Sequence, residues 1–490
     1  MKRVVIIGGG IAGLAAAYAL KENEGAKDLE VTLFERRPRL GGNIRTERVN
    51  GFIIEGGPDC FLSEKPWAMG LCKRLGLGER LLPTNDAHRK TYVLSGGRLR
   101  NLPEGVILMI PTKILPLLFS PLISVPGKMR MFLEPFIPRK KDKADETLGD
   151  FVRRRLGPEV LDKIAEPLIA GVHAGDPETM SIRSAFPKFV ELEENYGSLI
   201  LGMIKRMKAS SMKSGGAGGN RGKDGEKRPT MFMTLKGGLK ELVDELERRL
   251  SGVNENTRIR TGVEVAGITR SVGLYKVRLA SGDLINADSV IIAAPAYVAA
   301  SLLTGLDPGL SQKLLEIPYT STATVSVAFK KTDVRHPMDG FGFVVPRSEK
   351  RRIMASTWSS VKFKHRAPDD AVLIRCFLGG AKNPEVLSLS EDELVEIVMA
   401  ELKDIMGIDA TPVLKKAYKW PQSMPQYTVG HEQRVGLIEQ RILEAHPGLF
   451  LVGSAYRGIG ISDNIRNAED AARQALEFIG NQKNTVAPLP

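Results

Sequence analysis

A short apolar run opens the chain, at residues 4–7, and it is rich in β-branched side chains. It is too short for a globular helix and predicts a buried strand of a parallel sheet. Apolar positions then recur at helical spacing from residue 11 to residue 19, which predicts a helix. A second apolar run, at 30–34, predicts another strand. This order of strand, helix and strand is typical of an α/β domain.

Two further groups of apolar segments follow along the chain. One helical stripe, at 239–250, precedes segments with strand-like patterns at 258–260, 262–268, 275–279, 290–294 and 448–452. We expect these segments to rejoin the opening strands, so that one α/β domain is assembled from residues 1–84, 231–298 and 440–490. A second set of strand-like segments, with a helix at 391–406, predicts a mixed α+β domain over 299–439; these strands are at 324–329, 342–345, 353–358 and 371–377.

Residues 85–209 are predicted to form an α-helical insert, with helices at 148–161 and 187–207. The first part of the insert, 102–138, is apolar but is interrupted by seven prolines and by Lys113. A membrane-spanning helix needs roughly 20 uninterrupted apolar residues, so none is predicted here. Two interpretations stay open: short helices that cover a substrate cavity, or a surface that rests on a membrane. Residues 210–230 carry almost no apolar side chains, which predicts a disordered loop.

A glycine motif follows the first predicted strand: Gly8, Gly10 and Gly13 form G-x-G-x-x-G. The first glycine allows a tight turn, the second lets backbone amides approach a pyrophosphate, and the third lets the helix pack closely on the strand. The helix directs its positive N-terminus at the phosphates. Glu35 ends the second strand, where an acid accepts hydrogen bonds from a ribose hydroxyl pair and would repel the 2′-phosphate of NADP. Together these features predict a dinucleotide site.

Three more glycine-rich stretches extend this site. Residues 36–46 place arginines and a double glycine beside the expected pyrophosphate. Residues 56–59 form a loop that begins with two glycines, and the lack of side chains there would let a ring system lie against the backbone. Near the C-terminus, a glycine-rich turn at 453–460 separates a strand from a helix, for which we predict Ser462 as the N-cap. The N-terminus of this helix would stabilise negative charge on a reduced cofactor ring.

Composition narrows the class of protein. The 490 residues are 42% hydrophobic and 26% charged, as in a soluble globular protein. The net charge of +13 suits nucleic acid, an anionic membrane or an acidic small molecule, but no nucleic-acid motif accompanies it. Three widely spaced cysteines form neither a metal-binding pattern nor a disulfide framework, which favours a reducing compartment. The first strand leaves no room for a signal peptide, so a cytoplasmic protein is expected.

These motifs resemble those of the FAD-dependent amine-oxidase-like flavoproteins, in which the Rossmann motif is followed by Glu-x-x-x-Arg-x-Gly-Gly. More narrowly, the chain resembles the bacterial porphyrinogen oxidases of haem biosynthesis, and most of all those of Gram-positive bacteria that form coproporphyrin. The stretches that carry the narrower resemblance are 56–62, 166–176, 420–431 and 453–463. The resemblance implies an α/β fold with a Rossmann-type FAD domain, a mixed substrate domain and a helical insert.

The motifs and the resemblance together imply FAD as the cofactor, with contacts from these residues: Gly8, Gly9, Gly10, Ile11, Ala12, Gly13, Glu35, Arg36, Gly42, Asn43, Gly57, Pro58, Asp59, Cys60, Val265, Trp420, Ile459, Gly460 and Ile461. The resemblance places Trp420 against the flavin and the backbone of Val265 against the adenine. One departure is Ala468, where relatives often carry glycine early in the last helix. Lys65 has two interpretations: a contact to a substrate carboxylate, or a solvated surface lysine.

The activity implied by the resemblance is oxidation of coproporphyrinogen III to coproporphyrin III, with dioxygen as acceptor and hydrogen peroxide as product. The alternatives are oxidation of protoporphyrinogen IX, another amine-oxidase-like reaction such as carotenoid desaturation, and a non-enzymatic FAD-binding subunit. No catalytic residue is assigned, since His173 and His431 lie in family-like stretches but lone histidines are usually structural. We expect no metal and no nucleic acid. Transient contact with a haem-pathway enzyme or with the inner face of a membrane stays open.

Overall fold

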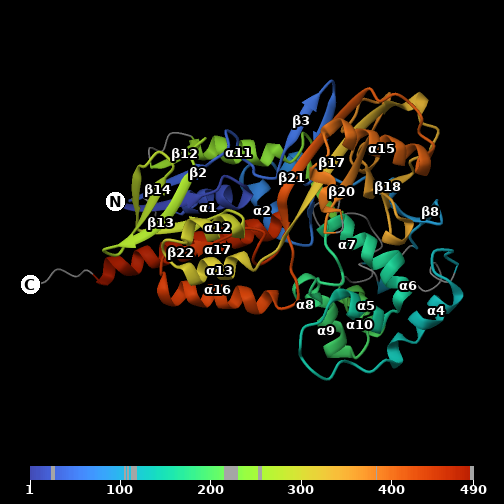
Figure 1. Ribbon diagram of the computed structural model, residues 1–490, viewed down its shortest axis with the longest axis horizontal. Coiled ribbons are helices and arrows are strands. Elements are labelled where there is room, and N and C mark those ends of the chain that lie inside the picture. The colour runs from blue at the N-terminus through green and yellow to red at the C-terminus, as the bar shows by residue number, and fades with distance from the viewer. Residues whose placement is uncertain are drawn as a thin grey trace, which may run out of the picture.

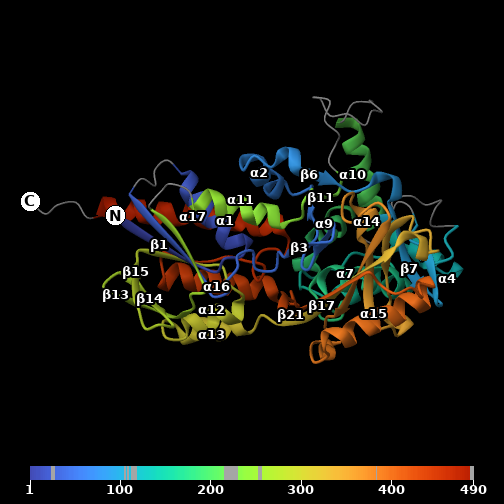
Figure 2. The ribbon, with the colours of Figure 1, turned by 90° about the horizontal axis from the view of Figure 1, so that it is seen from above.

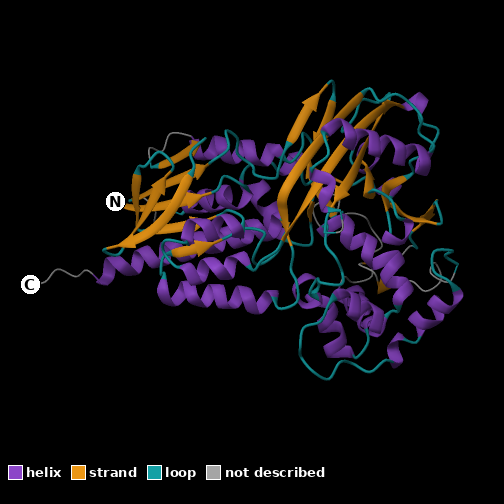
Figure 3. Ribbon diagram, in the orientation of Figure 1, coloured by secondary structure: helices purple, strands orange, loops and turns teal. Residues whose placement is uncertain are grey.

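The computed structural model describes residues 1–23, 28–103, 106–107, 110–111, 119–213, 230–251, 256–381 and 383–485. The molecule is elongated, with the N-terminus and helix α17 (Ile461–Thr485) at one end (Figure 1). One sheet lies at that end, and a second sheet and a group of helices share the other end (Figure 3). The view from above shows the same division (Figure 2). The predicted fold class is confirmed, with a parallel sheet, a mixed sheet and a helical part.

The first sheet has five parallel strands drawn from three separated parts of the chain. Its order is β12 (Thr257–Thr261), β2 (Leu29–Glu35), β1 (Lys2–Ile7), β16 (Ser289–Ile292) and β22 (Leu449–Leu451). The strand residues alternate between two cores, because side chains of a strand point to opposite faces. Val4 and Ile6 belong to one core, and Val5 and Ile7 belong to the other.

Different elements cover the two faces of this sheet. On the face of Val4 and Ile6 pack α1 (Ile11–Glu22), α11 (Lys240–Ser251), α17 and α2 (Pro66–Arg74). On the opposite face lie the strands β13 (Val265–Ser271), β14 (Leu274–Leu279) and β15 (Leu284–Ala287), with the helices α12 (Ala296–Leu303), α13 (Pro308–Leu315) and α16 (His431–Ala445). The result is a three-layer domain in which β1 is central and buried.

The second sheet is mixed and has seven strands. Its order is β21 (Leu414–Pro425), β17 (Tyr319–Lys330), β20 (Ala371–Gly379), β19 (Ile353–Trp358), β18 (Gly340–Val344), β7 (Lys90–Ser95) and β8 (Arg98–Asn101). Helix α15 (Glu391–Met406) packs against it. Strand β7 pairs in parallel with β18. Residues 90–101, which we grouped with the helical insert, therefore form two strands of this sheet.

Short pairings join the two sheets. Strands β3 (Thr46–Val49) and β4 (Phe52–Glu55) form a hairpin, and β5 (Phe61–Leu62), β11 (Phe232–Leu235) and β6 (Leu81–Pro83) form a small sheet. Phe52 and Ile54 pack in one core with residues of β17, β20 and β21. The chain from 46 to 83 therefore connects the first sheet to the second.

The helical part surrounds a separate core. Its elements are α4 (Val125–Phe132), η4 (Glu134–Phe136), α5 (Leu148–Arg155), α6 (Pro158–Val160), η5 (Leu161–Ala165), α7 (Glu166–His173), α8 (Ile182–Ala185), α9 (Pro187–Tyr196) and α10 (Leu199–Lys213). The last of these helices includes residues 210–213 of the predicted disordered loop, and the rest of that loop, 214–229, lies outside the described residues. None of the helices in the described part of the chain has the length and apolarity that crossing a membrane requires.

A buried ion pair fixes the helical part from within. Arg155 and Glu134 are both fully buried and hydrogen-bond to each other. Glu134 also accepts hydrogen bonds from the Ser198 hydroxyl and from the backbone N–H groups of Leu199 and Ile200, at the start of α10. The pair therefore ties η4, α5 and α10 together. A buried ion pair as a whole adds little to the stability of a fold, but removing one partner is strongly destabilising because the other charge stays buried and unpaired.

We expect Arg155→Met to lower the free energy of unfolding by about 3–5 kcal/mol, because Glu134 would keep its buried charge without a cation. Arg153→Met is the matched control, since Arg153 pairs with Asp150 and Glu178 at the surface and such pairs contribute about 0–1 kcal/mol. Urea titration followed by circular dichroism measures both. Equal losses in the two variants would show that the buried pair has no special role.

Candidate functional site

The turn between β1 and α1 brings backbone into unusually close contact. Gly8 has φ of 113°, a conformation that favours glycine, and a Cβ atom on Gly13 would lie 1.9 Å from the carbonyl oxygen of Gly8. A Cβ atom on Gly10 would meet only the Cα atom of Gly42, at 3.9 Å. The first and third glycines of the motif therefore serve packing, whereas Gly10 leaves space above the turn.

The N-terminus of α1 opens toward this space. Its N-cap is Gly10, which makes no side-chain capping bond, and its first turn contains no acidic residue. The first N–H groups of a helix have no partner within the helix and carry partial positive charge. Because Ile11 and Ala12 begin the helix here, their backbone N–H groups suit a phosphate group. This geometry fits the predicted pyrophosphate position.

Glu35 is held firmly at the end of β2. Its carboxylate accepts hydrogen bonds from the backbone N–H groups of Gly9, at 2.6 Å, and Arg37, at 2.9 Å. The residue is 9% exposed. A carboxylate can accept about four hydrogen bonds, so each oxygen keeps capacity for a ribose hydroxyl. Val265 begins β13 nearby, where the backbone N–H of Val263 bonds to the Glu35 carbonyl oxygen.

The loop after Glu35 is braced by an arginine that we did not include among the site residues. Arg39 donates to the carbonyl oxygen of Gly42 at 2.9 Å, and the backbone N–H of Gly41 donates to that of Gly9 at 2.8 Å. Burial, with repulsion from neighbouring arginines, lowers the pKa of Arg39. Arg36, a predicted cofactor contact, is exposed. The Arg-x-Gly-Gly spacing could have identified Arg39, because its side chain closes the loop that bears the double glycine.

A second loop, residues 56–60, packs directly against the loop that follows Glu35. A Cβ atom on Gly57 would lie 1.7 Å from the carbonyl oxygen of Asn43, so only glycine fits there. The carbonyl oxygen of Gly56 accepts hydrogen bonds from Trp420 Nε1, at 2.9 Å, and from Thr324 Oγ1, at 2.7 Å. Trp420 is therefore fixed beside this loop, and the predicted residues Asn43, Gly57 and Trp420 come together.

Charged side chains that are largely buried surround the end of this loop. Lys362 Nζ lies 2.9 Å from Asp59 Oδ2 and 3.5 Å from Cys60 Sγ. Burial alone would raise the pKa of Asp59, but Lys362 and Arg375 outweigh it and hold that pKa below its usual range. Burial and the charge of Asp59 raise the pKa of the Cys60 thiol. Arg375 also donates to the carbonyl oxygen of Gly57. Local sequence gave no signal for Lys362 or Arg375.

The last helix begins at the third predicted group, Ile459, Gly460 and Ile461. Helix α17 starts at Ile461, so Ser462 lies inside it and the predicted N-cap is wrong. The Ser462 hydroxyl instead donates to the backbone carbonyl of Lys65, at 3.1 Å. Lys65 Nζ pairs with Asp463 Oδ2 at 2.6 Å, and its side chain is 41% exposed. Lys65 therefore lies beside the predicted cofactor contacts and keeps part of its surface free.

Two aromatic rings support the turn that precedes α17. Tyr427 stacks on His431, with ring centroids 3.9 Å apart. The Tyr427 hydroxyl donates to the carbonyl oxygen of Ser454 and accepts from the backbone N–H of Gly458. Burial lowers the pKa of His431 to about 4, so the ring is neutral near pH 7. These contacts assign His431 a supporting position. In the described part of the chain, no group of three His, Cys, Asp or Glu residues could hold a metal ion.

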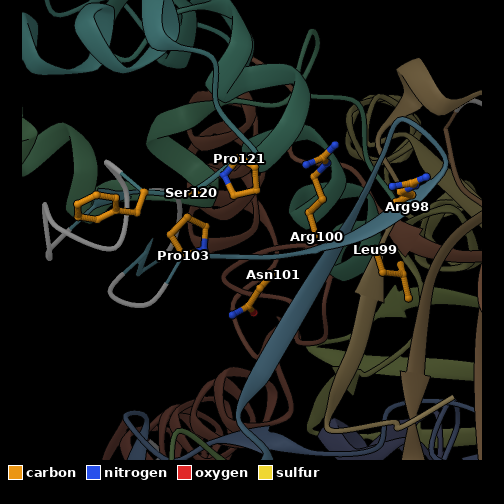
Figure 4. A pocket seen from close by; sticks show the side chains of 8 residues that line it. Arg98, Leu99, Arg100, Asn101, Pro103, Ser120 and Pro121 are labelled. Carbon is orange, nitrogen blue, oxygen red and sulfur yellow. The ribbon is translucent and has the colours of Figure 1, made fainter.

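A separate surface pocket of about 510 Å³ lies where β8 meets the helical part. Figure 4 shows Arg98 and Arg100 projecting from one side of β8 and Leu99 from the other. Asn101, Pro103, Phe119, Ser120 and Pro121 complete its lining. None of these residues belongs to the predicted cofactor set, so this pocket is distinct from the glycine-lined site.

The chain matches one protein family over most of its length. The model of that family, described as flavin-containing amine oxidoreductase, matches residues 11–476. Coproporphyrinogen III oxidase from Bacillus subtilis (strain 168) is 39% identical over 98% of both chains. Coproporphyrinogen III oxidase from Staphylococcus aureus (strain NCTC 8325 / PS 47) is 34% identical over 97% of this chain and 99% of that protein.

More distant relatives and solved structures agree with this match. Protoporphyrinogen oxidase 2 (chloroplastic/mitochondrial) from Arabidopsis thaliana is 29% identical over 99% of this chain and 96% of that protein. A crystal structure from Exiguobacterium sp. 255-15, provisionally named a protoporphyrinogen oxidase, superimposes with a TM-score of 0.83 at 32% identity, covering 97% of this chain and 99% of that one.

We expect Glu35→Ala to weaken FAD binding through the loss of charged hydrogen bonds to the ribose, worth roughly 1.5–3 kcal/mol each. Glu30→Ala is the matched control on the same strand, because among the described residues Glu30 pairs only with the surface arginines Arg3 and Arg258. Calorimetric titration of apoprotein with FAD measures both affinities. Unchanged affinity in Glu35→Ala would contradict the assignment of this carboxylate.

Proposed function

The chain belongs to the flavin-containing amine oxidoreductase family, and we propose that it oxidises coproporphyrinogen III to coproporphyrin III in haem biosynthesis. The coarser assignment is a flavoprotein oxidoreductase of porphyrin and haem biosynthesis. The observation that carries the finer one is the 39% identity to a coproporphyrinogen III oxidase over 98% of both chains. The runner-up is oxidation of protoporphyrinogen IX, supported by relatives such as the Arabidopsis enzyme at 29% identity.

The arrangement of residues supports separate roles for the cofactor and for the protein chain. A bound flavin supplies the electron-accepting chemistry, and we propose dioxygen as the final acceptor, with hydrogen peroxide as product. The chain's own residues bind and orient the flavin cofactor. Gly8–Gly13 and Glu35 hold its dinucleotide part, and the 56–60 loop with Trp420 holds its ring. We propose that the substrate lies between this site, the domain of residues 299–439 and the helical part. Lys65 is the proposed contact to a substrate carboxylate.

Charge favours the coproporphyrinogen over the protoporphyrinogen. The former carries four propionates and the latter two, and the chain has a net charge of +13. An exposed ion pair contributes only about 0–1 kcal/mol, whereas long-range attraction raises the encounter rate in a way that salt suppresses. Lys65 already pairs with Asp463, so we expect its own contribution to carboxylate binding to be modest.

We therefore expect a higher kcat/KM for coproporphyrinogen III than for protoporphyrinogen IX, with a gap that narrows as ionic strength rises. Lys65→Ala should lower the ratio of the two kcat/KM values further, by up to about fivefold, the equivalent of ~1 kcal/mol. Lys73→Ala removes the same charge from an exposed position on α2 and controls for net charge. Porphyrin fluorescence measures each rate. A preference for protoporphyrinogen at low salt would replace the proposal with its runner-up.

The helical part also offers a surface for contact with a membrane, in keeping with one of the two interpretations left open by the sequence. Large apolar side chains on α4 and η4 are exposed: Val125 by 69%, Met129 by 63% and Phe136 by 81%. Exposed basic residues follow at Arg139, Lys141 and Lys143. An apolar surface flanked by cations suits an anionic bilayer. We propose that the protein is cytoplasmic and makes peripheral contact through this surface.

Co-sedimentation with vesicles tests this contact. We expect binding to vesicles that contain phosphatidylglycerol, weakening with salt, and a clear loss in Phe136→Ser. Leu443→Ser is the control, because Leu443 is 78% exposed on α16, in the other part of the molecule. Equal binding by both variants, or none by the unmodified protein, would rule out this surface.

A further inference from the structure

The C-terminal end of helix α7 is partly exposed. Val172 exposes 65% of its surface there, and the next residue, His173, is half-buried. The imidazole of His173 makes an edge contact with the ring of Phe186, with centroids 5.6 Å apart. Within the described residues, neither ring nitrogen of His173 has a hydrogen-bond partner. The imidazole is therefore available to a ligand.

The backbone around His173 is fixed from the second sheet. Gln426 Nε2 donates to the carbonyl oxygen of His173 at 3.2 Å, and the backbone N–H of Ala381 donates to that of Ala174 at 2.9 Å. Ala174 itself takes a left-handed conformation, with φ of 50°, and ends the helix. These bonds fix the backbone from which the imidazole projects, and a group that acts on a substrate needs such a fixed support.

His173 faces the same region as Lys65. The charge of Lys65 is close enough to affect the ionisation of His173, and Lys65 pairs with Asp463 beside the predicted cofactor contacts Gly460 and Ile461. The other charged groups around this region are Glu64 paired with Lys188 of α9, and on α7 itself Glu166, which accepts from the backbone N–H of Arg347. Phe186, the N-cap residue of α9, contacts His173, and Lys188 of α9 pairs with Glu64, so α9 joins His173 to the segment that holds Lys65.

The imidazole is neutral at physiological pH. Burial lowers the pKa of His173 to about 4, and the positive charge of Lys65 acts in the same direction. A base with a lowered pKa stays unprotonated until the pH falls near that value. The neutral imidazole of His173 therefore carries one N–H donor and one acceptor nitrogen.

Building on the proposed function, we propose that His173 contacts the tetrapyrrole and accepts the pyrrole proton released when the substrate is dehydrogenated. In each two-electron step, a bound flavin would supply the acceptor for a carbon-bound hydrogen and its electron pair. A pyrrole N–H bond breaks, its proton passes to His173, and its electron pair enters the new C=N bond. Dioxygen takes the hydride equivalent and one proton to form hydrogen peroxide, so the proton that the imidazolium releases balances the one consumed.

Chemical rescue separates this role from a packing role. We expect His173→Ala to lower kcat by roughly 10²–10⁴-fold, the range for general acid–base groups, while affinity for the product coproporphyrin III changes little. Added imidazole should restore part of kcat, with the extent depending on the pKa of the imidazole derivative. His365→Asn is the control, because His365 is exposed and its φ of 66° is one that asparagine tolerates. Turnover within twofold of the unmodified protein, or a loss that no imidazole restores, would overturn the proposal.

A measurement on the unmodified holoenzyme does not depend on how the variant folds. NMR of histidine labelled with ¹³C, assigned with His173→Gln, follows the titration of His173 with and without coproporphyrin III. Carboxylates of the bound porphyrin should raise the pKa of His173 by roughly 1–3, and an unchanged titration would overturn the proposed contact. If the unmodified protein oxidises no porphyrinogen, the proposed function fails; if it does and His173 passes neither test, only this inference fails.

Discussion

The close approach of α1 to β1 is the constraint on which the rest of the site depends. A Cβ atom on Gly13 would lie 1.9 Å from the carbonyl oxygen of Gly8, and a Cβ atom on Gly8 would lie 2.4 Å from that of Ala293. Only glycine therefore lets the helix start directly above the strand, with its free N–H groups facing outward. Because β1 is the central strand and is buried on both faces, this start is fixed by the whole first domain.

Close backbone contacts then extend the site outward from this turn. The loop around Gly42 lies against Gly10, and the loop around Gly57 lies against Asn43. Each loop is held by hydrogen bonds to its own backbone carbonyls, from Arg39 in the first case and from Trp420, Thr324 and Arg375 in the second. Three segments within the first 60 residues are thus positioned by hydrogen bonds to their carbonyl groups, which leaves their remaining N–H groups for a ligand.

Much of the fold and of this site could be predicted because the signals are local. Strand and helix periodicity is read over a few residues, and the glycine motif and Glu35 lie within one strand–helix–strand unit. The contacts that the sequence did not reveal join distant residues: Asp59 pairs with Lys362 across 303 positions, and Lys65 with Asp463 across 398. Residues 90–101 were missed as strands of the second sheet for the same reason, since β7 pairs with β18 far along the chain. The Ser462 prediction failed differently: helix α17 starts earlier, and the hydroxyl bonds to Lys65 instead.

These ion pairs between residues far apart in the sequence also determine how much unpaired charge the site carries. Lys362 faces Asp59, Lys65 faces Asp463, and Arg375 adds a cation beside Asp59, so the cations there are largely matched by carboxylates. These three cations and two carboxylates therefore account for only one of the thirteen net positive charges of the chain. Long-range attraction of the proposed acidic substrate would act over the distance that salt screens, whereas its recognition at short range would depend on groups with unused hydrogen-bonding capacity. His173 is such a group: it carries no charge at neutral pH, and both of its ring nitrogens are without partners in the described part of the chain.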